Sequence, residues 1–227
     1  MKAMILAAGR GERLRPLTDT LPKAMVEAGG KPLIAWHLER LARAGCPHAV
    51  INVSHLGERI VERIGEGTRY GLRITYSRES QPLETAGGIA LALPQLGAEP
   101  FLVVNADIYC ECDFRRLLGT ELGERRAHLV VIPNPPHHPE GDFTLEAGRI
   151  GNAAAPRYTY AGISVLSPAL VAEVRAGEKA QLAPLLRAAA ERGLVSGERY
   201  DGAWHDVGTA ERLAELHARL ASRHETS

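Results

Sequence analysis

Hydrophobic and polar positions follow two alternating patterns along most of the chain. Short apolar runs of strand length are separated by segments whose apolar residues recur at helical spacing. This alternation predicts an α/β protein whose mainly parallel sheet is covered by helices on both faces. The expected strands are Lys2–Ala8, Ala49–Ser54, Leu72–Ser77, Phe101–Asn105, His128–Ile132 and Tyr158–Leu166, and the expected helices are Pro32–Ala44, Gly57–Gly65, Thr85–Leu93 and Phe114–Leu122.

The pattern changes after Val131. A proline-rich stretch, unsuited to a helix or an inner strand, follows directly. Next, Phe143–Glu146 and Arg149-Ile150 flank a turn at Ala147-Gly148, which predicts a hairpin outside the parallel sheet. The chain then returns to helical spacing, at Pro184–Glu191 and Thr209–Ala221. No repeat, low-complexity tract or linker interrupts the sequence, so we expect a single domain over residues 1–227.

Composition narrows the class of protein. The 227 residues include 27 basic and 27 acidic side chains, and this balance argues against a nucleic-acid or membrane-surface partner. No apolar run reaches the ~18–20 residues that span a bilayer. The odd cysteine count, with Cys46, Cys110 and Cys112, favours a reducing cytoplasm over a disulfide framework.

The loop after the first expected strand has the composition of a phosphate site. Gly9 and Gly11 follow the strand, and Arg13 and Lys23 come after them. Ligands of open α/β sheets bind at the carboxyl ends of strands, where glycines let backbone amides approach phosphate oxygens. The loop lacks the third glycine of a dinucleotide fingerprint and the Gly-Lys-Ser/Thr of a P-loop. The plainer alternative is a glycine-rich turn with solvated arginines.

Two aspartates occupy positions suited to a hard cation. Asp107 follows the strand Phe101–Asn105, and Asp206 precedes the last expected helix. Mg²⁺ usually takes one or two carboxylates together with substrate phosphates. Each aspartate taken alone also fits an ordinary role, in a turn or at a helix start. Cys110 and Cys112 are too few for a zinc site and are expected to be packing residues, while His205 is either a partner of the site or a packing residue.

The segments Leu6–Thr18, Leu21–Met25 and Lys31–Leu33 resemble the signature of the sugar-1-phosphate nucleotidyltransferases, and the similarity extends over nearly the whole chain. The resemblance implies an open, doubly wound, Rossmann-like mixed sheet of the nucleotide-diphospho-sugar transferase type. It implies an enzyme that joins a nucleoside triphosphate to a sugar 1-phosphate and releases pyrophosphate. The nucleotide-binding part would be about 1–110 and the sugar-binding part about 111–227.

The resemblance also implies roles for individual residues. Arg13 and Lys23 would be catalytic, and Asp107 and Asp206 would hold Mg²⁺. The nucleotide would contact Ala8, Gly9, Gly11, Glu12, Arg13, Lys23, Gln81, Thr85 and Gly87. The sugar would contact Asn105, Glu140, Gly141, Asp142, Asn152, Tyr160 and Gly162.

The run Asn134–Phe143 resembles the branch of the family that transfers uridylyl groups from UTP to N-acetylmuramate 1-phosphate during peptidoglycan recycling. His137, His138 and Arg157 would be candidates for binding the lactyl carboxylate of that sugar. Other sugar 1-phosphates (glucose, heptose or mannose), thymidine in place of uridine, a glycosyltransferase and a non-catalytic nucleotide-sugar binding protein remain alternatives. The sequence does not fix the oligomeric state.

Overall fold

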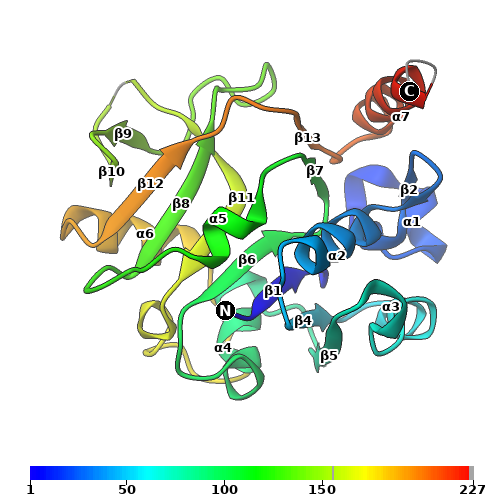
Figure 1. Cartoon of the computed structure of the whole chain (residues 1–227), viewed down its shortest axis with the longest axis horizontal. Coiled ribbons are helices and arrows are strands. Elements are labelled where there is room, and N and C mark those ends of the chain that lie inside the picture. The colour runs from blue at the N-terminus through cyan, green and yellow to red at the C-terminus, as the bar shows by residue number, and fades with distance from the viewer. Residues whose placement is uncertain (155, 225–227) are drawn as a thin grey trace.

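The computed structural model describes residues 1–154 and 156–224, and nine strands of this part of the chain form one mixed sheet (Figure 1). The strand order is β5-β4-β1-β6-β11-β8-β12-β10-β9. The first four of these strands are parallel, β11 is antiparallel to both of its neighbours, and β12 is parallel to β8. The bounds are β1 (Ala3–Leu6), β4 (His48–Val53), β5 (Arg73–Arg78), β6 (Phe101–Asn105), β8 (Ala127–Ile132), β9 (Thr144–Glu146), β10 (Arg149–Gly151), β11 (Thr159–Leu166) and β12 (Val195–Arg199).

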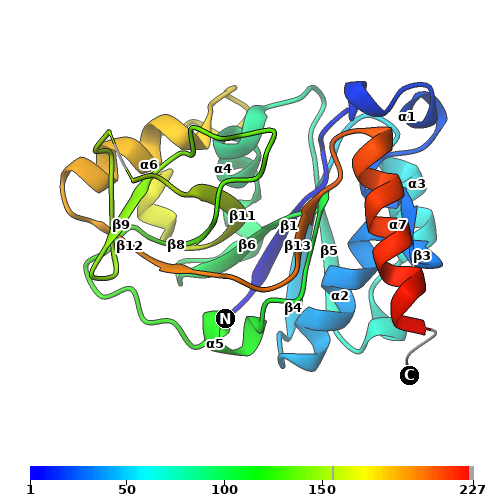
Figure 2. The same ribbon diagram turned by 90° about the horizontal axis from the view of Figure 1, so that it is seen from above.

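Helices cover both faces of the sheet, as Figure 2 shows. The helices α2 (Leu33–Arg43), α3 (Gly57–Ile64) and α5 (Phe114–Leu118) pack on one face, and α4 (Glu84–Leu96) and α6 (Leu182–Glu191) pack on the other. Successive side chains of a strand point to opposite faces. In β1, Ile5 therefore joins the first hydrophobic core and Met4 the second. The predicted doubly wound α/β fold with a mixed sheet is confirmed.

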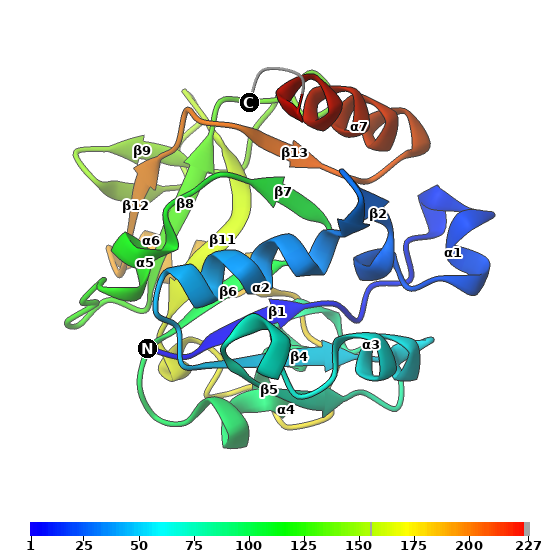
Figure 3. The ribbon, with the colours of Figure 1, turned by 45° about the vertical axis from the view of Figure 1, so that its right-hand side comes forward.

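A third, smaller core lies outside α2. Leu216 and Leu220 of α7 (Ala210–His224) pack there with Tyr109 and Leu33. Two short antiparallel pairs lie close by: β2 (Glu27–Ala28) with β3 (Lys31–Pro32), and β7 (Ile108–Cys110) with β13 (Trp204–Asp206). Figure 3 shows α7 beside β13 and β2, so this helix lies over the segment that follows β6.

The expected elements are present, with boundaries that differ by a few residues. Helix α4 continues past Pro94 to Leu96, because a proline in the last turn disturbs few helical bonds. Helix α5 ends at Leu118 rather than Leu122, where Gly119 caps it. The β9–β10 hairpin is not separate from the main sheet: β10 pairs with β12 and extends the sheet edge. None of the described helices is both long and apolar enough to cross a bilayer.

Short irregular elements connect the rest. They were not expected from the sequence, because each is too short to show a period. They are η1 (Glu12–Leu14), α1 (Leu17–Thr20), η2 (Lys23–Met25), η3 (Thr68–Tyr70) and η4 (Pro168–Leu170).

Candidate nucleotide site

A cavity of about 770 Å³ opens at the carboxyl ends of the parallel strands. Three backbone segments line it: residues 6–13 after β1, residues 82–85 at the start of α4, and residues 105–107 at the end of β6. Because the parallel strands end at one edge of the sheet, residues from distant parts of the sequence meet there. The remaining lining residues are Lys23, Ala24, Asn52, Glu79 and Gly208.

The glycine-rich loop is packed at one glycine and open at the other. Gly11 has a φ of 66°, and a Cβ there would lie 3.0 Å from both Thr18 Cγ2 and Lys23 Cβ. The Thr18 hydroxyl donates to the Gly11 carbonyl at 2.8 Å and fixes the turn. A Cβ on Gly9 would meet nothing within 4 Å. The loop is therefore packed against the protein at Gly11, and at Gly9 it leaves room for a ligand.

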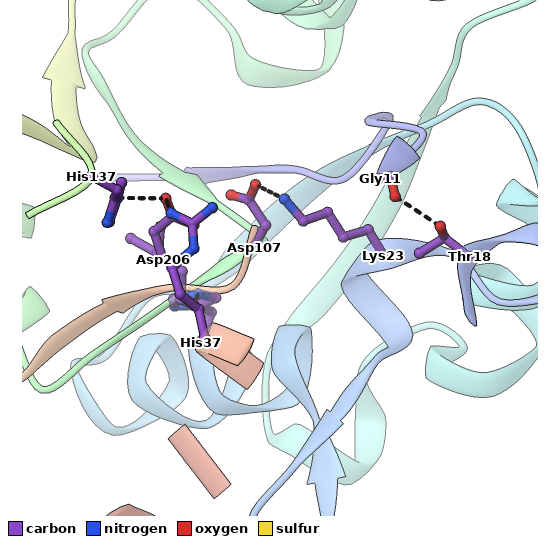
Figure 4. Close-up of polar contacts among 9 residues, drawn as sticks. Gly11, Thr18, Lys23, His37, Asp107, His137 and Asp206 are labelled. Atoms are coloured by element: carbon purple, nitrogen blue, oxygen red, sulfur yellow. Dashed lines mark hydrogen bonds and ion pairs between the residues drawn. The ribbon is translucent and has the colours of Figure 1, made fainter. Parts of the chain in front are cut away.

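Three cationic side chains line the cavity, and they are held differently. Lys23 Nζ lies 2.5 Å from Asp107 Oδ2 (Figure 4). Arg10 and Arg13 are exposed, and neither guanidinium pairs with a side chain in the described residues. Arg10 had no role among the sequence-based expectations, although its place between Gly9 and Gly11 marks it as part of the same loop. The cavity therefore offers two guanidinium groups, unpaired within the described residues, and one fixed ammonium to which phosphates can bind.

The two aspartates expected to hold a metal come from adjacent backbone segments. Strands β7 and β13 pair antiparallel, and the amide of Val207 donates to the Asp107 carbonyl at 2.9 Å. Asp206 Oδ2 lies 2.5 Å from Arg212 Nη1 and 3.2 Å from His137 Nε2 (Figure 4). A Cβ on Gly208 would lie 2.2 Å from Arg212 Nη2, so the glycine makes room for this pair.

The donor set fits a metal that is shared with a substrate. No group of three or more His, Cys, Asp or Glu side chains suited to a metal occurs in residues 1–154 and 156–224. Two carboxylates without further protein ligands cannot form a closed structural site, but they match Mg²⁺ that is also bound by phosphate oxygens. Asp107 lines the cavity, while Asp206 does not, although Gly208, two positions further along the chain, does.

The segment expected to recognise the base divides into two parts. Thr85 lines the cavity, and Gln81 and Gly87 are absent from its lining. The amides of Ala86 and Gly87 both donate to the Ala180 carbonyl, at 2.9 and 3.1 Å. A Cβ on Gly87 would lie 2.3 Å from the Glu178 carbonyl oxygen. The structure thus gives Gly87 a packing role, and its amide is not a free donor to a base.

Among the residues expected to bind the sugar, Asn105 lines the cavity. Gly162 lies against it, with a φ of 73°, and a Cβ there would be 2.7 Å from Asn105 Nδ2. Both residues lie where β11 passes beside the end of β6, next to an irregularity in the pairing of β11 with β8. Glycine at this position therefore keeps the Asn105 amide free to face the cavity.

The other residues expected to bind the sugar lie outside the cavity lining, and most of them stabilise their own loops. Asp142 accepts hydrogen bonds from the Tyr160 amide at 2.8 Å and pairs with His138 at 3.1 Å. Asn152 Nδ2 donates to the Arg187 carbonyl at 2.9 Å. Glu140 is exposed on the same loop, and Gly141 turns beneath Asn134 and Arg157.

The candidates for a lactyl carboxylate are also engaged within the protein. Arg157 Nε donates to the Ala153 carbonyl at 2.9 Å, and His138 binds Asp142. His137 contacts Asp206, so it is the candidate that joins the proline-rich loop to the nucleotide cavity. The hydroxyl of Tyr160 bonds to Ser164, and burial raises the pKa of Tyr160 to about 12.

The cysteines and His205 are packing residues. All three cysteines are free and buried, and burial raises the pKa of Cys110 to about 11 and of Cys112 to about 12. The His205 ring lies beside Tyr109, with 6.5 Å between centroids, and burial lowers its pKa. Neutral thiols of this kind are poor nucleophiles and poor metal ligands.

A cationic glycine-rich loop, a lysine paired with a strand-end aspartate and a second aspartate beside it define a protein that handles nucleoside phosphates at the edge of an α/β sheet. Residues 2–144 match the family model of the nucleotidyl transferases, and the chain belongs to that family. Members act on a nucleoside triphosphate and a sugar 1-phosphate, generally with a divalent metal ion. The expected family is confirmed.

The relatives share most of this chain. It is 48% identical over 225 residues to the N-acetylmuramate alpha-1-phosphate uridylyltransferase of Neisseria meningitidis serogroup B, covering 96% of this chain and 97% of that protein. Mannose-1-phosphate guanylyltransferases are more distant. The catalytic subunit beta of Danio rerio is 31% identical and the Aspergillus fumigatus enzyme 34% identical, each over 92% of this chain. The chain spans 61% of the length of those two relatives.

A solved structure supports the fold. A Bacillus anthracis protein assigned as a glucose-1-phosphate thymidylyltransferase, in complex with sucrose, superposes with a TM-score of 0.84. The match covers 97% of this chain and 95% of that one, at 21% identity.

Proposed function

We propose that this protein transfers the uridylyl group of UTP to N-acetyl-α-muramate 1-phosphate, giving UDP-N-acetylmuramate and pyrophosphate for peptidoglycan recycling. The observation that carries the proposal is the 48% identity to the Neisseria uridylyltransferase over nearly the full length of both chains. The arrangement of Arg13, Lys23 and Asp107 around one cavity supports the same reaction class. We place the reaction in the cytoplasm, because free cysteines suit a reducing compartment.

In the proposed reaction, a phosphate oxygen of the sugar 1-phosphate attacks the α-phosphorus of UTP. The new bond joins that oxygen to the α-phosphorus, and the bond from the α-phosphorus to the bridging oxygen breaks, releasing pyrophosphate. The sugar phosphate is already ionised at neutral pH, so the step needs no general base. What the protein must supply is positioning and charge stabilisation.

Arg13 and Lys23 supply the charge. Lys23 is half of an ion pair beside the cavity, so its ammonium is already placed before substrate binds. Arg13 has no partner within the described residues and is free to follow the leaving pyrophosphate. Pre-placed cations stabilise the charge that develops on the reacting phosphates without further reorganisation.

Asp107 and Asp206 are the residues we propose as Mg²⁺ ligands. When bound, Mg²⁺ would offset the repulsion between the two phosphate groups that must meet. In the structure Lys23 forms an ion pair with Asp107, Arg212 forms one with Asp206, and His137 Nε2 also contacts Asp206. These contacts hold both carboxylates in place beside the cavity.

The substrates divide between two parts of the proposed single domain. Residues about 1–110 hold the nucleotide, with Ala8, Gly9, Glu12 and Thr85 along the cavity. Residues about 111–227 hold the sugar through the loops that carry Glu140, Asp142, Asn152 and Tyr160, and Asn105 of the first part contacts the sugar at the border. Because these loops lie outside the cavity lining, we expect the sugar to extend from the cavity toward His137 and the proline-rich loop.

The test is pyrophosphate release from UTP and Mg²⁺ with the 1-phosphates of N-acetylmuramate, N-acetylglucosamine, glucose and mannose. CTP, dTTP and GTP serve as base controls. We expect release with UTP and N-acetylmuramate 1-phosphate. Preference for another sugar would retain the reaction class and overturn the substrate. Binding of UTP without release for any sugar would favour a nucleotide-sugar binding protein instead.

A further inference from the structure

Asn52 and Glu79 form a buried polar pair that the proposed reaction does not use. Asn52 lies in β4 with 3% of its surface exposed, and Glu79 follows β5 with 6% exposed. Both line the nucleotide cavity. A glutamate is almost never this deeply buried without hydrogen-bond partners, so the groups bonded to Glu79 indicate its role.

The pair joins two loops through a continuous chain of hydrogen bonds. The Ala7 amide donates to Asn52 Oδ1 at 2.8 Å, and Asn52 Nδ2 donates to Glu79 Oε1 at 2.7 Å. The Leu83 amide donates to Glu79 Oε2 at 3.1 Å. Ala7 begins the glycine-rich loop, and Leu83 caps the start of α4. The bridge therefore spans the two segments that face each other across the cavity.

The direction of the bonds dictates the residue types. Both ends of the bridge are backbone N–H donors, so each end needs an acceptor. Asn52 accepts at one side and donates at the other, and the Glu79 carboxylate accepts twice. Turning the Asn52 amide over would set its NH₂ group against the Ala7 amide. One amide and one carboxylate is thus the combination that satisfies every group.

Helix α4 is shaped to leave space for this bridge. A Cβ on Gly88 would lie 2.5 Å from Glu79 Oε1 and 2.9 Å from Asn52 Nδ2. Glycine inside a helix is unfavourable relative to alanine. Glycine nevertheless occupies position 88, where a methyl group would displace the bridge.

We propose that Asn52 and Glu79 are positioning residues that fix the distance between the loop 7–13 and the turn 82–85, and thereby select the base that fits between them. The inference rests on the proposed function for the identity of the nucleotide. Loosening the bridge should weaken nucleotide binding and reduce the preference for UTP over CTP. The effect should fall on KM for UTP more than on kcat, because neither residue holds the reacting phosphates.

The test is a reciprocal exchange of amide and carboxylate. In Glu79→Gln, the new NH₂ group faces either the Leu83 amide or the Asn52 NH₂ group, so two donors meet. Asn52→Asp places two carboxylates together, which at mildly alkaline pH repel. The double variant N52D/E79Q restores a complete chain, because the amide introduced at position 79 donates to the carboxylate introduced at position 52, while both side chains still accept from the Leu83 and Ala7 amides. Glu58→Gln removes an exposed carboxylate on α3 and serves as the matched control.

The measurements are the Kd of UTP and of CTP by calorimetry, the steady-state KM and kcat, and the free energy of unfolding in urea. We expect each single variant to raise the Kd of UTP about tenfold or more, which corresponds to ~1.4 kcal/mol, and to narrow the UTP/CTP ratio. The double variant should return to within about threefold of the wild type. Non-additivity of this kind is what directly coupled residues show.

Two results would overturn the inference. One is single variants that lower only the free energy of unfolding, with the UTP affinity and the UTP/CTP ratio unchanged. The other is a double variant no better than the worse single one. If E79Q does not fold, Gly88→Ala provides a second probe, because its methyl group presses on the bridge. Unchanged UTP binding by the G88A variant would also overturn the inference.

The binding measurements separate this inference from the proposed function. Wild-type protein that binds UTP but releases no pyrophosphate would contradict the function and still allow the bridge to be tested by Kd. If the wild type binds another nucleotide more tightly, the series is run with that nucleotide. Wild-type protein that binds none of the four nucleotides would overturn both.

Discussion

At the scale of single residues, the site differs in how firmly each charge is held. The Lys23 ammonium is fixed by Asp107, whereas the Arg13 guanidinium is exposed and has no partner in the described residues. A fixed cation can stabilise developing charge at once, while a free one can follow a departing group. Lys23 therefore suits the reacting phosphate, and Arg13 suits the leaving pyrophosphate.

Arg13→Ala should lower the rate of pyrophosphate release by roughly 10²–10³-fold, as is typical when one charge-stabilising group is lost. Arg15→Ala is the matched control, because Arg15 is exposed, pairs with Asp19 and does not line the cavity. We expect it to retain nearly full activity. Equal losses in the two variants, measured as kcat/KM at saturating Mg²⁺, would contradict the assignment of Arg13.

His37 makes stability depend on pH. The ring is fully buried and donates from Nε2 to the Ile108 carbonyl at 2.7 Å, while Nδ1 has no hydrogen-bond partner among the described residues. Burial lowers its pKa from 6.5 to about 4, and the nearby Arg40 acts in the same direction while Asp107 opposes it. Between these values the unfolded chain binds a proton that the folded chain does not. Stability should therefore fall as the pH falls from about 6.5 to 4.

The His37 contribution should approach ~3 kcal/mol, given ~1.4 kcal/mol per pKa unit. His37→Gln removes the titrating group and should flatten the pH dependence of the free energy of unfolding in that window. His217→Gln, on the exposed side of α7, should leave the wild-type dependence unchanged. An H37Q curve parallel to that of the wild type from pH 7 to pH 4 would refute the prediction.

At the scale of elements, α7 connects a hydrophobic core to the site. Leu216 is 0% exposed and packs in the third core with Val207 and Tyr109, while Arg212 of the same helix holds Asp206. Helix packing and the position of the second aspartate are thus linked through one element. A loosened α7 is expected to weaken this packing and to let Asp206 move.

Leu216→Ala should lower the free energy of unfolding by ~2–5 kcal/mol, the usual effect of truncating a buried leucine. Its neighbour Glu215 is exposed, so Glu215→Ala should change stability by no more than ~0.5 kcal/mol. Urea denaturation of the two variants gives the comparison. A loss below about 1 kcal/mol in L216A would mean that α7 is not docked as the structure describes.

The elements also show what the sequence could predict. Strands such as β1 and β6 were predictable because their buried runs are continuous. β12 was missed, since its Gly197 interrupts the apolar pattern; a Cβ there would lie 2.6 Å from Ile150 Cδ1, so its place depends on a distant partner. β7 and β13 are three residues each and exist only as a pair.

The site, too, could be predicted from the sequence only in part. The glycine-rich loop was predictable because its residues are contiguous, and the structure brings most of them to one cavity. The bridge between Asn52 and Glu79 joins residues 27 positions apart, so no local motif announces it. Likewise, nothing in the sequence reveals that the Gly87 amide is bound to Ala180 or that His137 reaches Asp206.

At the scale of the whole molecule, the proposed nucleotide and sugar parts share one sheet. β6 belongs to the first part and pairs along four residues with β11 of the second, and both faces of the sheet carry cores that continue across this junction. Neither part can expose its edge without breaking the central hydrogen bonds. If residues 1–110 and 111–227 unfolded separately, both hydrophobic cores would therefore be split.

We predict that the chain unfolds in one transition in scanning calorimetry, and that UTP with Mg²⁺ moves the whole transition upward. At a nucleotide concentration 100 times the Kd, binding to the folded state adds ~2.7 kcal/mol. For a chain of this size each kcal/mol raises Tm by ~2–4 °C, so the expected shift is ~5–10 °C. Two transitions, of which UTP moves only one, would show that the halves fold independently. The sugar loops would then reach the nucleotide only by domain docking, and the continuous sheet from β5 to β9 would not be the unit that aligns the two substrates.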